Sequence, residues 1–519
     1  MAQTRDDFIK AAANHDVVPV TRCVLGDHLT PVLAYRRLVR EDARGDTSFL
    51  LESVETGGVI GRYSILAAQP DREITARRDQ VCMVDHASGA TETCTSSDPL
   101  DLIRTQMGRV RVAPIDIPEL AHVFLGGWAG WFSYDTVRWL EPKAMAESQS
   151  PPDDRSLPDL HLGCYQNVVV FDHLAKTLLV TCWANVSEST AEAAWSDANA
   201  SIDQVLSRLD QTDVTLASTQ MPIDAPIPSG LPGTAVTSRE DFERGVRQCI
   251  EYIKAGDIFQ VVPSQRFERE SAVDPFDVYR ALRVVNPSPY MIYMQSPEVV
   301  LVASSPEILC KVRGRTVTSR PLAGTRRRGV DHEEDQALEA SLRADAKELA
   351  EHAMLVDLAR NDLGRVCQAG TVEVDRLKDV ERYSHVMHLS STVTGTLEEG
   401  KDCWDALRQA LPVGTVSGAP KIRAMQIIDA LEPVRRGPYA GGIGCVSFGG
   451  DMDVAIALRT IVVPSPGTGP PWSYHLQAGA GVVLDSIPER EYQETIDKAA
   501  ALGCAIDVAE ASAQHQHKS

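Results

Sequence analysis

Three glutamates fall within six positions of the stretch "SIPEREYQETIDK", which follows the glycine-bearing segment "QAGAGVVLD". Ser486 and Glu489 have the spacing of a capping box, so Glu489 is expected to serve the start of a helix. Glu491 and Glu494 are three residues apart on one face, and Lys498 follows Glu494 at the favourable i,i+4 spacing. Periodicity favours a solvated helix face; the alternative is a pair of carboxylates that holds a cation.

Another carboxylate, Glu351 in "KELAEHAMLVDLARNDLG", lies on the apolar stripe of a predicted helix. Met354, Leu355 and Leu358 follow it at i+3, i+4 and i+7, and an ionised group on such a stripe is costly unless it is paired or bound to a metal. Lys347, one turn earlier, offers an ion pair. The ion pair and the metal-ligand role are both open from the residues alone.

A glycine-rich turn in "PVGTVSGAPKIRAMQIIDALEP" leads into a predicted helix. The amides of residues 417–421 would suit an anion, but the segment also fits an ordinary helix start. Its spacing differs from that of a nucleotide-binding P-loop.

Alternation along a predicted strand, "DVAIALRTIVV", places Arg459 on the same face as the small residues Ala455 and Ala457. This arrangement suits a cavity for a carboxylate, and an edge-strand arginine that reaches solvent is the alternative. His385 and His388 in "YSHVMHLSS" are three residues apart, and histidines of this kind are more often structural than catalytic.

The elements that must position these groups follow from the hydrophobic pattern. The first half of the chain mixes strand-like runs such as "NVVVFD" and "TLLVTCWANV" with helical ones such as "AEAAWSDANASIDQVLSRL". The second half opens with an acidic capping box at Ser238 and Asp241, and strands such as "VVLVASS" then alternate irregularly with long helices. The irregular order favours the α+β class, and polar, proline-bearing connections at 143–159 and 211–237 suggest portions 1–235 and 236–519.

Composition limits the function further. The 519 residues are 43% apolar and carry a formal charge of −21, which disfavours nucleic acid and anionic membranes as partners. No signal peptide or long apolar segment is evident, so a cytoplasmic protein is expected. The eleven scattered cysteines are expected to be reduced and mostly buried.

Seven segments in order resemble the chorismate-utilising enzymes: "PLAGT", "EHAMLVDLARNDLGRV", "SHVMH", "GTVSGAPK", "GPYAGGIG", "IALRT" and "QAGAGVVLDSIPEREYQETIDK". With "FLLES" and "NPSPYM", the chain is similar to the large subunits (component I) of anthranilate synthase over nearly its whole length. The resemblance implies large β-sheets flanked by helices, with an N-terminal regulatory, tryptophan-binding portion at 1–235 and a chorismate-binding catalytic domain at 236–519.

The resemblance also implies the site. It assigns Mg²⁺ to Glu351 and Glu494, with Glu491 beside the ion, and so reverses the solvated-face interpretation. The chorismate contacts that it implies are Gly324, Thr325, Tyr439, Arg459, Gly479, Ala480 and Gly481. His388, Thr415 and Lys498 are the implied catalytic residues, and His388 is expected to protonate the departing C4 hydroxyl.

Two positions indicate which reaction of the family to expect. Ala323 occupies the place at which aminodeoxychorismate synthases carry a nucleophilic lysine, and an alanine cannot form that bond. Gln260 occupies the place of the lysine base of isochorismate and salicylate synthases. The expected reaction is therefore addition of ammonia to chorismate to give anthranilate and pyruvate, the first committed step of tryptophan biosynthesis; an aminodeoxychorismate synthase component I and a catalytically inactive tryptophan-sensing relative are the alternatives.

The ammonia requires a source. The chain has no cysteine in the GxCxGxQ setting of glutamine amidotransferases, so the resemblance implies a separate glutaminase subunit as partner. The motifs "FLLES" and "NPSPYM" resemble the tryptophan feedback site of the family. They assign the inhibitor contacts to Leu51, Glu52, Ser53, Pro289, Tyr290 and Met291.

Overall fold

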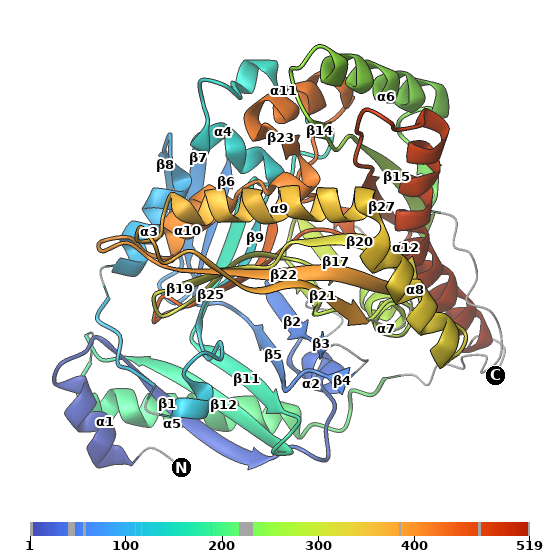
Figure 1. Ribbon diagram of the computed structural model, residues 1–519. Coiled ribbons are helices and arrows are strands. Elements are labelled where there is room, and N and C mark those ends of the chain that lie inside the picture. Colours follow the sequence, from blue (N-terminus) through green and yellow to red (C-terminus); the bar gives the residue numbers. More distant parts are fainter. Residues whose placement is uncertain are drawn as a thin grey trace.

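The computed structural model describes residues 4–39, 47–55, 59–108, 110–115, 117–187, 189–216, 232–382, 386–464 and 469–516. Within these ranges the chain forms two large antiparallel sheets, which pack face to face and are covered by helices on their outer faces (Figure 1). The α+β class expected from the sequence is confirmed.

The first sheet has 11 strands among the described residues. In spatial order they are β1 (Val17–Leu25), β12 (Thr177–Asn185), β11 (Asn167–Asp172), β5 (Tyr63–Ala68), β2 (Ser48–Glu52), β16 (Tyr290–Gln295), β17 (Val299–Ser305), β26 (Thr460–Pro464), β27 (Trp472–Gly479), β15 (Ser264–Ser271) and β13 (Thr234–Ala235).

The second sheet has 12 strands in the described part of the chain. In spatial order they are β20 (Leu322–Arg327), β22 (Val386–Thr396), β19 (Thr316–Ser319), β18 (Ile308–Arg313), β25 (Met452–Ile456), β24 (Gly442–Ser447), β9 (Gly127–Phe132), β10 (Leu160–Tyr165), β6 (Arg72–Arg77), β7 (Gln80–Asp85) and β8 (Ala90–Thr95), with β21 (Glu373–Arg382) paired to β22. Two short pairs join β14 (Gln260–Val261) to β23 (Gly418–Ala419) and β3 (Val54–Glu55) to β4 (Val59–Ile60).

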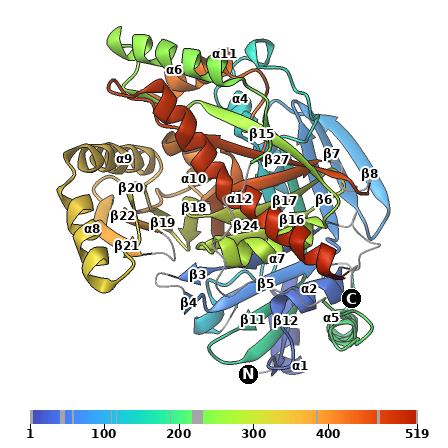
Figure 2. The same ribbon diagram turned by 90° about the vertical axis from the view of Figure 1, so that its right-hand side faces the viewer.

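The helices lie on the outer faces of the sheets and at their edges (Figures 1 and 2). They are α1 (Arg5–Ala12), α2 (Pro31–Leu38), α3 (Pro99–Gly108), α4 (Val137–Leu140), α5 (Ala191–Leu209), α6 (Arg239–Lys254), α7 (Pro275–Val285), α8 (His332–Ala344), α9 (Ala346–Gly364), α10 (Cys403–Ala410), α11 (Lys421–Leu431) and α12 (Pro488–Gln516).

The inner faces of the two sheets form one apolar layer. Phe49, Val170 and Leu301 of the first sheet pack in the same cluster as Trp131 and Ile443 of the second. Alternating side chains on the outer faces pack against the helices in two further clusters. Burial on both faces explains why strands such as "NVVVFD" and "VVLVASS" are nearly continuous apolar runs.

Both sheets contain strands from both sides of residue 235, since β2 pairs with β16 and β9 pairs with β24. The division at residue 235 therefore separates two proposed roles, regulatory and catalytic, but it does not separate two hydrophobic cores. Part of the expected connection, 217–231, lies outside the described residues.

Several local expectations hold. Helix α5 spans the predicted segment, and α6 begins after Ser238, whose side chain accepts a hydrogen bond from the Asp241 amide. All eleven cysteines are free thiols, and most are buried, although Cys23 is exposed. Among the described residues, no helix combines the length and apolar character that crossing a membrane requires.

Candidate active site

A cavity of about 840 Å³ opens between α9, α12 and the ends of β20, β22 and β27. Figure 2 shows α8 and α9 on one side of the molecule, with the long helix α12 beside them. Among the described residues, most of the predicted catalytic, substrate and metal residues line this cavity: Glu351, Glu491, Glu494, His388, Thr415, Lys498, Gly324, Tyr439, Arg459, Gly479 and Gly481. The segments that carry them are far apart in sequence, so the fold brings together the motifs that the sequence only places in order.

The carboxylates on α9 and α12 face the same space. Burial and the neighbouring Glu348 carboxylate raise the pKa of Glu351, and burial together with Glu494 raises the pKa of Glu491. The Gln260 amide donates to Glu351 at 3.4 Å. Because these carboxylates repel one another when ionised, a cation between them would lower the electrostatic repulsion.

Lysines compensate part of this charge. Lys498 pairs with Glu494 at 2.7 Å, as its i,i+4 spacing predicts, and donates to the Gly479 carbonyl at 3.0 Å. Lys347 lines the same cavity. It lowers the pKa of Glu351 less than burial and the Glu348 carboxylate raise it. The simple Lys347–Glu351 ion pair is therefore not the main feature of this carboxylate.

The first turn of α12 differs from the capping-box expectation. The helix begins at Pro488, which puts Ile487 at the N-cap, and the Ser486 hydroxyl accepts from the Val483 amide and contacts Glu491. Glu491 is only 8% exposed, so the solvated-face interpretation is wrong for this residue. Glu491 and Thr495, one helical turn apart, are both buried.

Arg459 lies in the cavity wall but not within a strand. The predicted run "DVAIALRTIVV" is broken into β25 and β26, because the Leu458 amide turns back to the Ile456 carbonyl and Arg459 adopts a positive φ of 46°. Burial lowers the pKa of the guanidinium from 12.5, although arginine stays charged in proteins. Among the described residues no carboxylate forms an ion pair with it, which leaves a buried cation able to bind an anion.

His388 on β22 lies opposite a bulge in β20. Gly324 has a φ of +71° and interrupts the register between Ala323 and Thr325, which favours glycine at this position. The Nδ1 atom of His388 lies 3.3 Å from the Gly324 carbonyl, to which it donates as a neutral ring. Burial and the nearby Arg459 lower the pKa of His388 to about 4, so the ring is neutral at physiological pH.

Tyr439 and the turn after β27 form another wall. Burial raises the pKa of the Tyr439 hydroxyl to about 12, and this hydroxyl contacts the Gly479 backbone. A Cβ at Gly479 would lie 2.9 Å from the Pro263 carbonyl, so only glycine fits.

Two predicted substrate contacts are not placed in the cavity wall. Ala480 is fully buried, its amide donates to the Pro263 carbonyl, and it is not among the residues that line the cavity, so its contact with chorismate stays a prediction. The side chain of Thr325 lies outside the described residues, as does the whole of His385.

Glu307 is a cavity residue that the sequence reasoning missed. It lies two residues after the end of β17, and burial raises its pKa to about 8, a shift that the Thr415 hydroxyl opposes only in part. The buried Thr415 hydroxyl makes no hydrogen bond within the described part of the chain. Its only sequence signal is a carboxylate between two continuous apolar strands, "VVLVASS" and "ILCKV". Such a group remains largely protonated near neutral pH.

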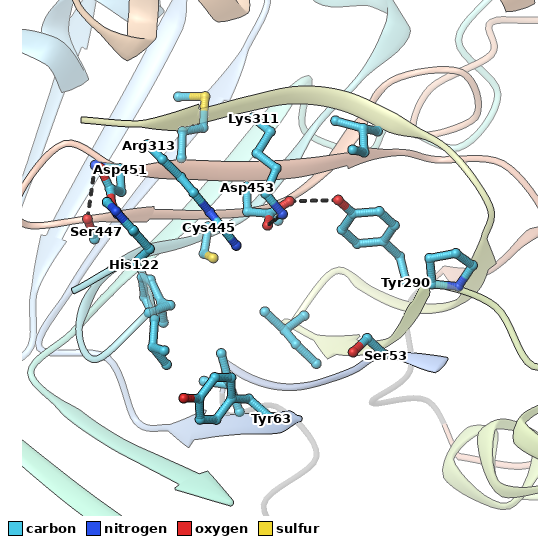
Figure 3. Close-up of a pocket in the computed structure, with 18 of the residues that line it drawn as sticks. Ser53, Tyr63, His122, Tyr290, Lys311, Arg313, Cys445, Ser447, Asp451 and Asp453 are labelled. Atoms are coloured by element: carbon cyan, nitrogen blue, oxygen red, sulfur yellow. Dashed lines mark hydrogen bonds and ion pairs between the residues drawn. The ribbon is translucent and has the colours of Figure 1, made fainter. Parts of the chain in front are cut away.

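A second cavity of about 760 Å³ lies between the two sheets, at the end of β2 (Figure 3). Of the predicted inhibitor contacts, Leu51, Glu52, Ser53, Pro289 and Tyr290 line it. The Tyr290 hydroxyl donates to Asp453 at 2.8 Å, and Lys311 pairs with the other oxygen of that carboxylate. Figure 3 shows Lys311, Asp453 and Tyr290 grouped on the side of the cavity opposite Tyr63.

Two of the six inhibitor assignments, Met291 and Glu52, differ in detail from a simple cavity contact. Met291 is one position along β16 from Tyr290, so its side chain points into the core on the other face of the sheet, where it is 1% exposed. The Glu52 carboxylate is engaged by Arg283 at 2.7 Å and by the Tyr279 hydroxyl at 2.7 Å. Glu52 therefore reaches the cavity as part of a buried ion pair.

The carboxylate oxygens of this cavity are ligands of the kind that a hard cation such as Mg²⁺ prefers. Within the described residues no three His, Cys, Asp or Glu side chains are gathered into a ready cluster for a metal ion. Mg²⁺, however, is commonly held by one or two carboxylates together with water and substrate oxygens. Glu351 and Glu494, on opposite walls of one cavity that also exposes Glu491, provide such a set.

A family model described as chorismate binding enzyme matches residues 47–503. The chain belongs to the chorismate-binding enzymes. It is 51% identical to anthranilate synthase alpha subunit 1, chloroplastic, of Oryza sativa subsp. japonica, over 97% of this chain and 90% of the relative. It is 42% identical to anthranilate synthase component 1 of Pseudomonas aeruginosa, over 98% of this chain and 100% of the relative.

A solved structure agrees with this chorismate-binding assignment. Anthranilate synthase component I from Streptococcus pneumoniae TIGR4 superposes with a TM-score of 0.71 at 37% sequence identity, covering 92% of this chain and 99% of that chain. Because the match covers most of both chains, the architecture of this chorismate-binding enzyme is that of its family.

Proposed function

We propose that this chain is the catalytic subunit of an anthranilate synthase, which converts chorismate and ammonia to anthranilate, pyruvate and water. The observation that carries the proposal is that Arg459, which forms no ion pair within the described residues, lines one cavity of about 840 Å³ together with Glu351 and Glu494. Relatives named anthranilate synthase cover the chain almost completely, which supports the same reaction here. Ala323 and Gln260, which line the cavity, provide neither a lysine nucleophile nor a lysine base.

The residues of the cavity can bind a dianionic ring. Arg459 would pair with one carboxylate of chorismate, and the backbone at Gly479 and Gly481 allows a close approach because glycine carries no Cβ. The carboxylates of this cavity suit a divalent cation, so Glu351 and Glu494 would hold Mg²⁺, with Glu491 beside them. When bound, Mg²⁺ would supply positive charge next to the second carboxylate of the substrate.

Glu307 is better suited than His388 to deliver the first proton. Ammonia forms a bond to C2 while the C4–O bond breaks with its electron pair on oxygen, and a proton on that oxygen gives water. A carboxyl with a pKa of about 8 is protonated at pH 7, whereas a ring with a pKa of about 4 is not. We therefore propose Glu307 as the acid, and His388 as a neutral ring that accepts the C2 proton when the enolpyruvyl group leaves and pyruvate forms.

The second cavity suits tryptophan as a feedback inhibitor. Its walls include Leu51, Ile65 and Ile292, and its polar groups include Ser53 and Asp453. An indole would contact the apolar walls, and the ammonium of an amino acid would be attracted by the Asp453 carboxylate. Feedback by the end product of the pathway is part of the proposal.

The proposal includes a glutaminase partner. The names "component 1" and "alpha subunit" of the relatives indicate a multi-subunit enzyme, and a separate glutamine amidotransferase would supply the ammonia. A cytoplasmic location belongs to the same proposal, while the plant relatives are named chloroplastic.

The proposal is tested by anthranilate fluorescence with the purified chain, chorismate and MgCl₂. With ammonium chloride we expect turnover that EDTA abolishes and excess Mg²⁺ restores. With glutamine in place of ammonium we expect none until a glutaminase subunit is added. Formation of 4-amino-4-deoxychorismate or isochorismate, or turnover from glutamine by the chain alone, would contradict the proposal.

A further inference from the structure

A small space of about 30 Å³ lies beneath α9, next to the large cavity. The two spaces share Glu307, Leu355 and Thr415 as wall residues, so the Glu307–Thr415 pair stands between them. This volume holds one or two water molecules, since one water needs roughly 10–15 Å³. The small space therefore adjoins the proposed acid from the side away from the substrate.

A second carboxyl group, on α9, also lines this space. Asp362 lies near the C-terminal end of α9, and its side chain is 14% exposed. Lys421 of α11 donates to it at 3.1 Å and also donates to the Gln409 carbonyl at 3.1 Å. The Asp362 carboxyl thus faces both the enclosed space and the molecular surface.

The lining combines hydrogen-bonding groups with apolar walls. Glu307, Thr318, Thr415 and Asp362 provide the polar groups, and Leu358 and Ala359 of α9 are among the apolar residues. A water needs two to four polar partners to be held in such a site. Burial also raises the pKa of Asp362, which brings its proton affinity closer to that of Glu307.

We propose that Asp362 is a positioning residue that passes protons from solvent, through water beneath α9, to Glu307 after each turnover. The inference rests on the proposed function, because it assigns Glu307 as the proton donor. In the first step the Glu307 O–H bond breaks and its proton joins the departing hydroxyl to form water. A buffer acid at the surface protonates the Asp362 carboxylate. The Glu307 carboxylate then takes a proton from an intervening water, and that water takes the proton from Asp362.

The decisive variant is Asp362→Asn, compared with two matched variants. Asp357→Asn removes an exposed carboxylate from the same helix, where it pairs with Arg360. Lys421→Met breaks the Asp362 ion pair but keeps the carboxyl. With saturating ammonium and Mg²⁺ and at low buffer concentration, we expect Asp362→Asn to lower kcat at least about tenfold with unchanged KM for chorismate. We expect the two matched variants to keep kcat within about twofold of the unmodified chain.

Rescue by a diffusible acid separates a proton-transfer defect from a structural one. Raising the concentration of imidazole buffer should restore the kcat of Asp362→Asn and leave the other chains unchanged. The inference is overturned if kcat of Asp362→Asn equals that of the unmodified chain. It is also overturned if Lys421→Met loses as much activity as Asp362→Asn and imidazole rescues neither.

A second measurement does not depend on the variant folding. A high-resolution crystal structure of the unmodified chain should show ordered water between Glu307 and Asp362, within about 3 Å of polar atoms at each end. A dry space would overturn the inference. Anthranilate formation by the unmodified chain is measured first, and its absence would contradict the proposed function. If the unmodified chain is active and Asp362→Asn is equally active, only the proton path is contradicted.

Discussion

Glu307 is the residue whose environment departs most from what its type predicts. Glu307 is 6% exposed, and its pKa is about 8 rather than 4.5. Desolvation of the charged form explains this direction. The cavity consequently contains a carboxyl group that is largely neutral near pH 7, together with the Arg459 guanidinium.

Replacing Glu307 with glutamine should remove this acid without emptying the site. We expect Glu307→Gln to lower kcat for anthranilate formation by roughly 10²- to 10⁴-fold, because general acid catalysis contributes on that order. Steady-state kinetics with ammonium as nitrogen source measures the change. The exposed Glu399→Gln serves as control, and a kcat within threefold of the unmodified chain for Glu307→Gln would contradict the assignment.

The same carboxyl should make stability depend on pH. Its pKa is raised in the folded chain, so its stabilising contribution is present below about 4.5 and is lost as pH rises towards about 8. The free energy of unfolding of Glu307→Gln should therefore exceed that of the unmodified chain by on the order of 1–3 kcal/mol at pH 8. Urea unfolding at pH 5 and pH 8 tests this. An equal difference at both pH values would contradict the assigned burial.

Residue types and spacing anticipated a large part of this site and missed the rest for physical reasons. Glu351 stood out because a carboxylate on an apolar stripe needs a partner. Glu307 gave no such signal, since a single carboxylate between two buried strands cannot be assigned to a cavity without knowing which strands are neighbours. Periodicity misjudged Glu491 because spacing groups residues on one face of a helix but does not reveal which neighbouring elements cover that face.

At the scale of elements, α9 and α12 place their carboxylates on facing walls of one cavity. The boundaries of α5 and α6 were predictable from caps and apolar period, and both agree with the structure. The strand through Arg459 was not, because alternation in the sequence continues across a turn in which one residue adopts a positive φ. Local periodicity therefore predicts which segments form helices or strands, whereas the positions at which a strand is interrupted depend on tertiary contacts.

The end of β2 offers a prediction about inhibition. Ser53 lines the second cavity, and a phenyl ring there would fill space proposed for tryptophan. We expect Ser53→Phe to keep kcat within about twofold while raising the inhibitory concentration of tryptophan at least about tenfold. Inhibition curves measure this, with the exposed Ser207→Phe on α5 as control. Unchanged inhibition of Ser53→Phe would count against this cavity as the tryptophan site.

At the scale of the molecule, the two cavities share a wall. Pro289 and Pro306 line both, and Pro306 directly precedes Glu307. The strands on either side belong to the two packed sheets, which contain residues from both halves of the chain. This strand order depends on long-range pairings such as β2 with β16, which the sequence alone did not reveal.

The shared wall predicts reciprocal coupling between the two ligands. Because coupling free energy is the same in both directions, saturating chorismate analogue with Mg²⁺ should weaken tryptophan binding by about 5- to 150-fold. Titration calorimetry measures the tryptophan Kd with and without the analogue. Pro306→Ala should reduce the coupling while each separate Kd changes little; equal tryptophan affinity in both conditions in the unmodified chain would contradict the coupling.

The central claim is that carboxylates from α9 and α12 hold one divalent cation against a carboxylate ligand. The most direct measurement is anomalous diffraction from crystals soaked with Mn²⁺ and a dicarboxylate analogue of chorismate. The account predicts one peak about 2.0–2.3 Å from oxygens of both Glu351 and Glu494, with the ligand between that peak and Arg459. A peak away from these two carboxylates, or ligand density in a different cavity, would contradict it.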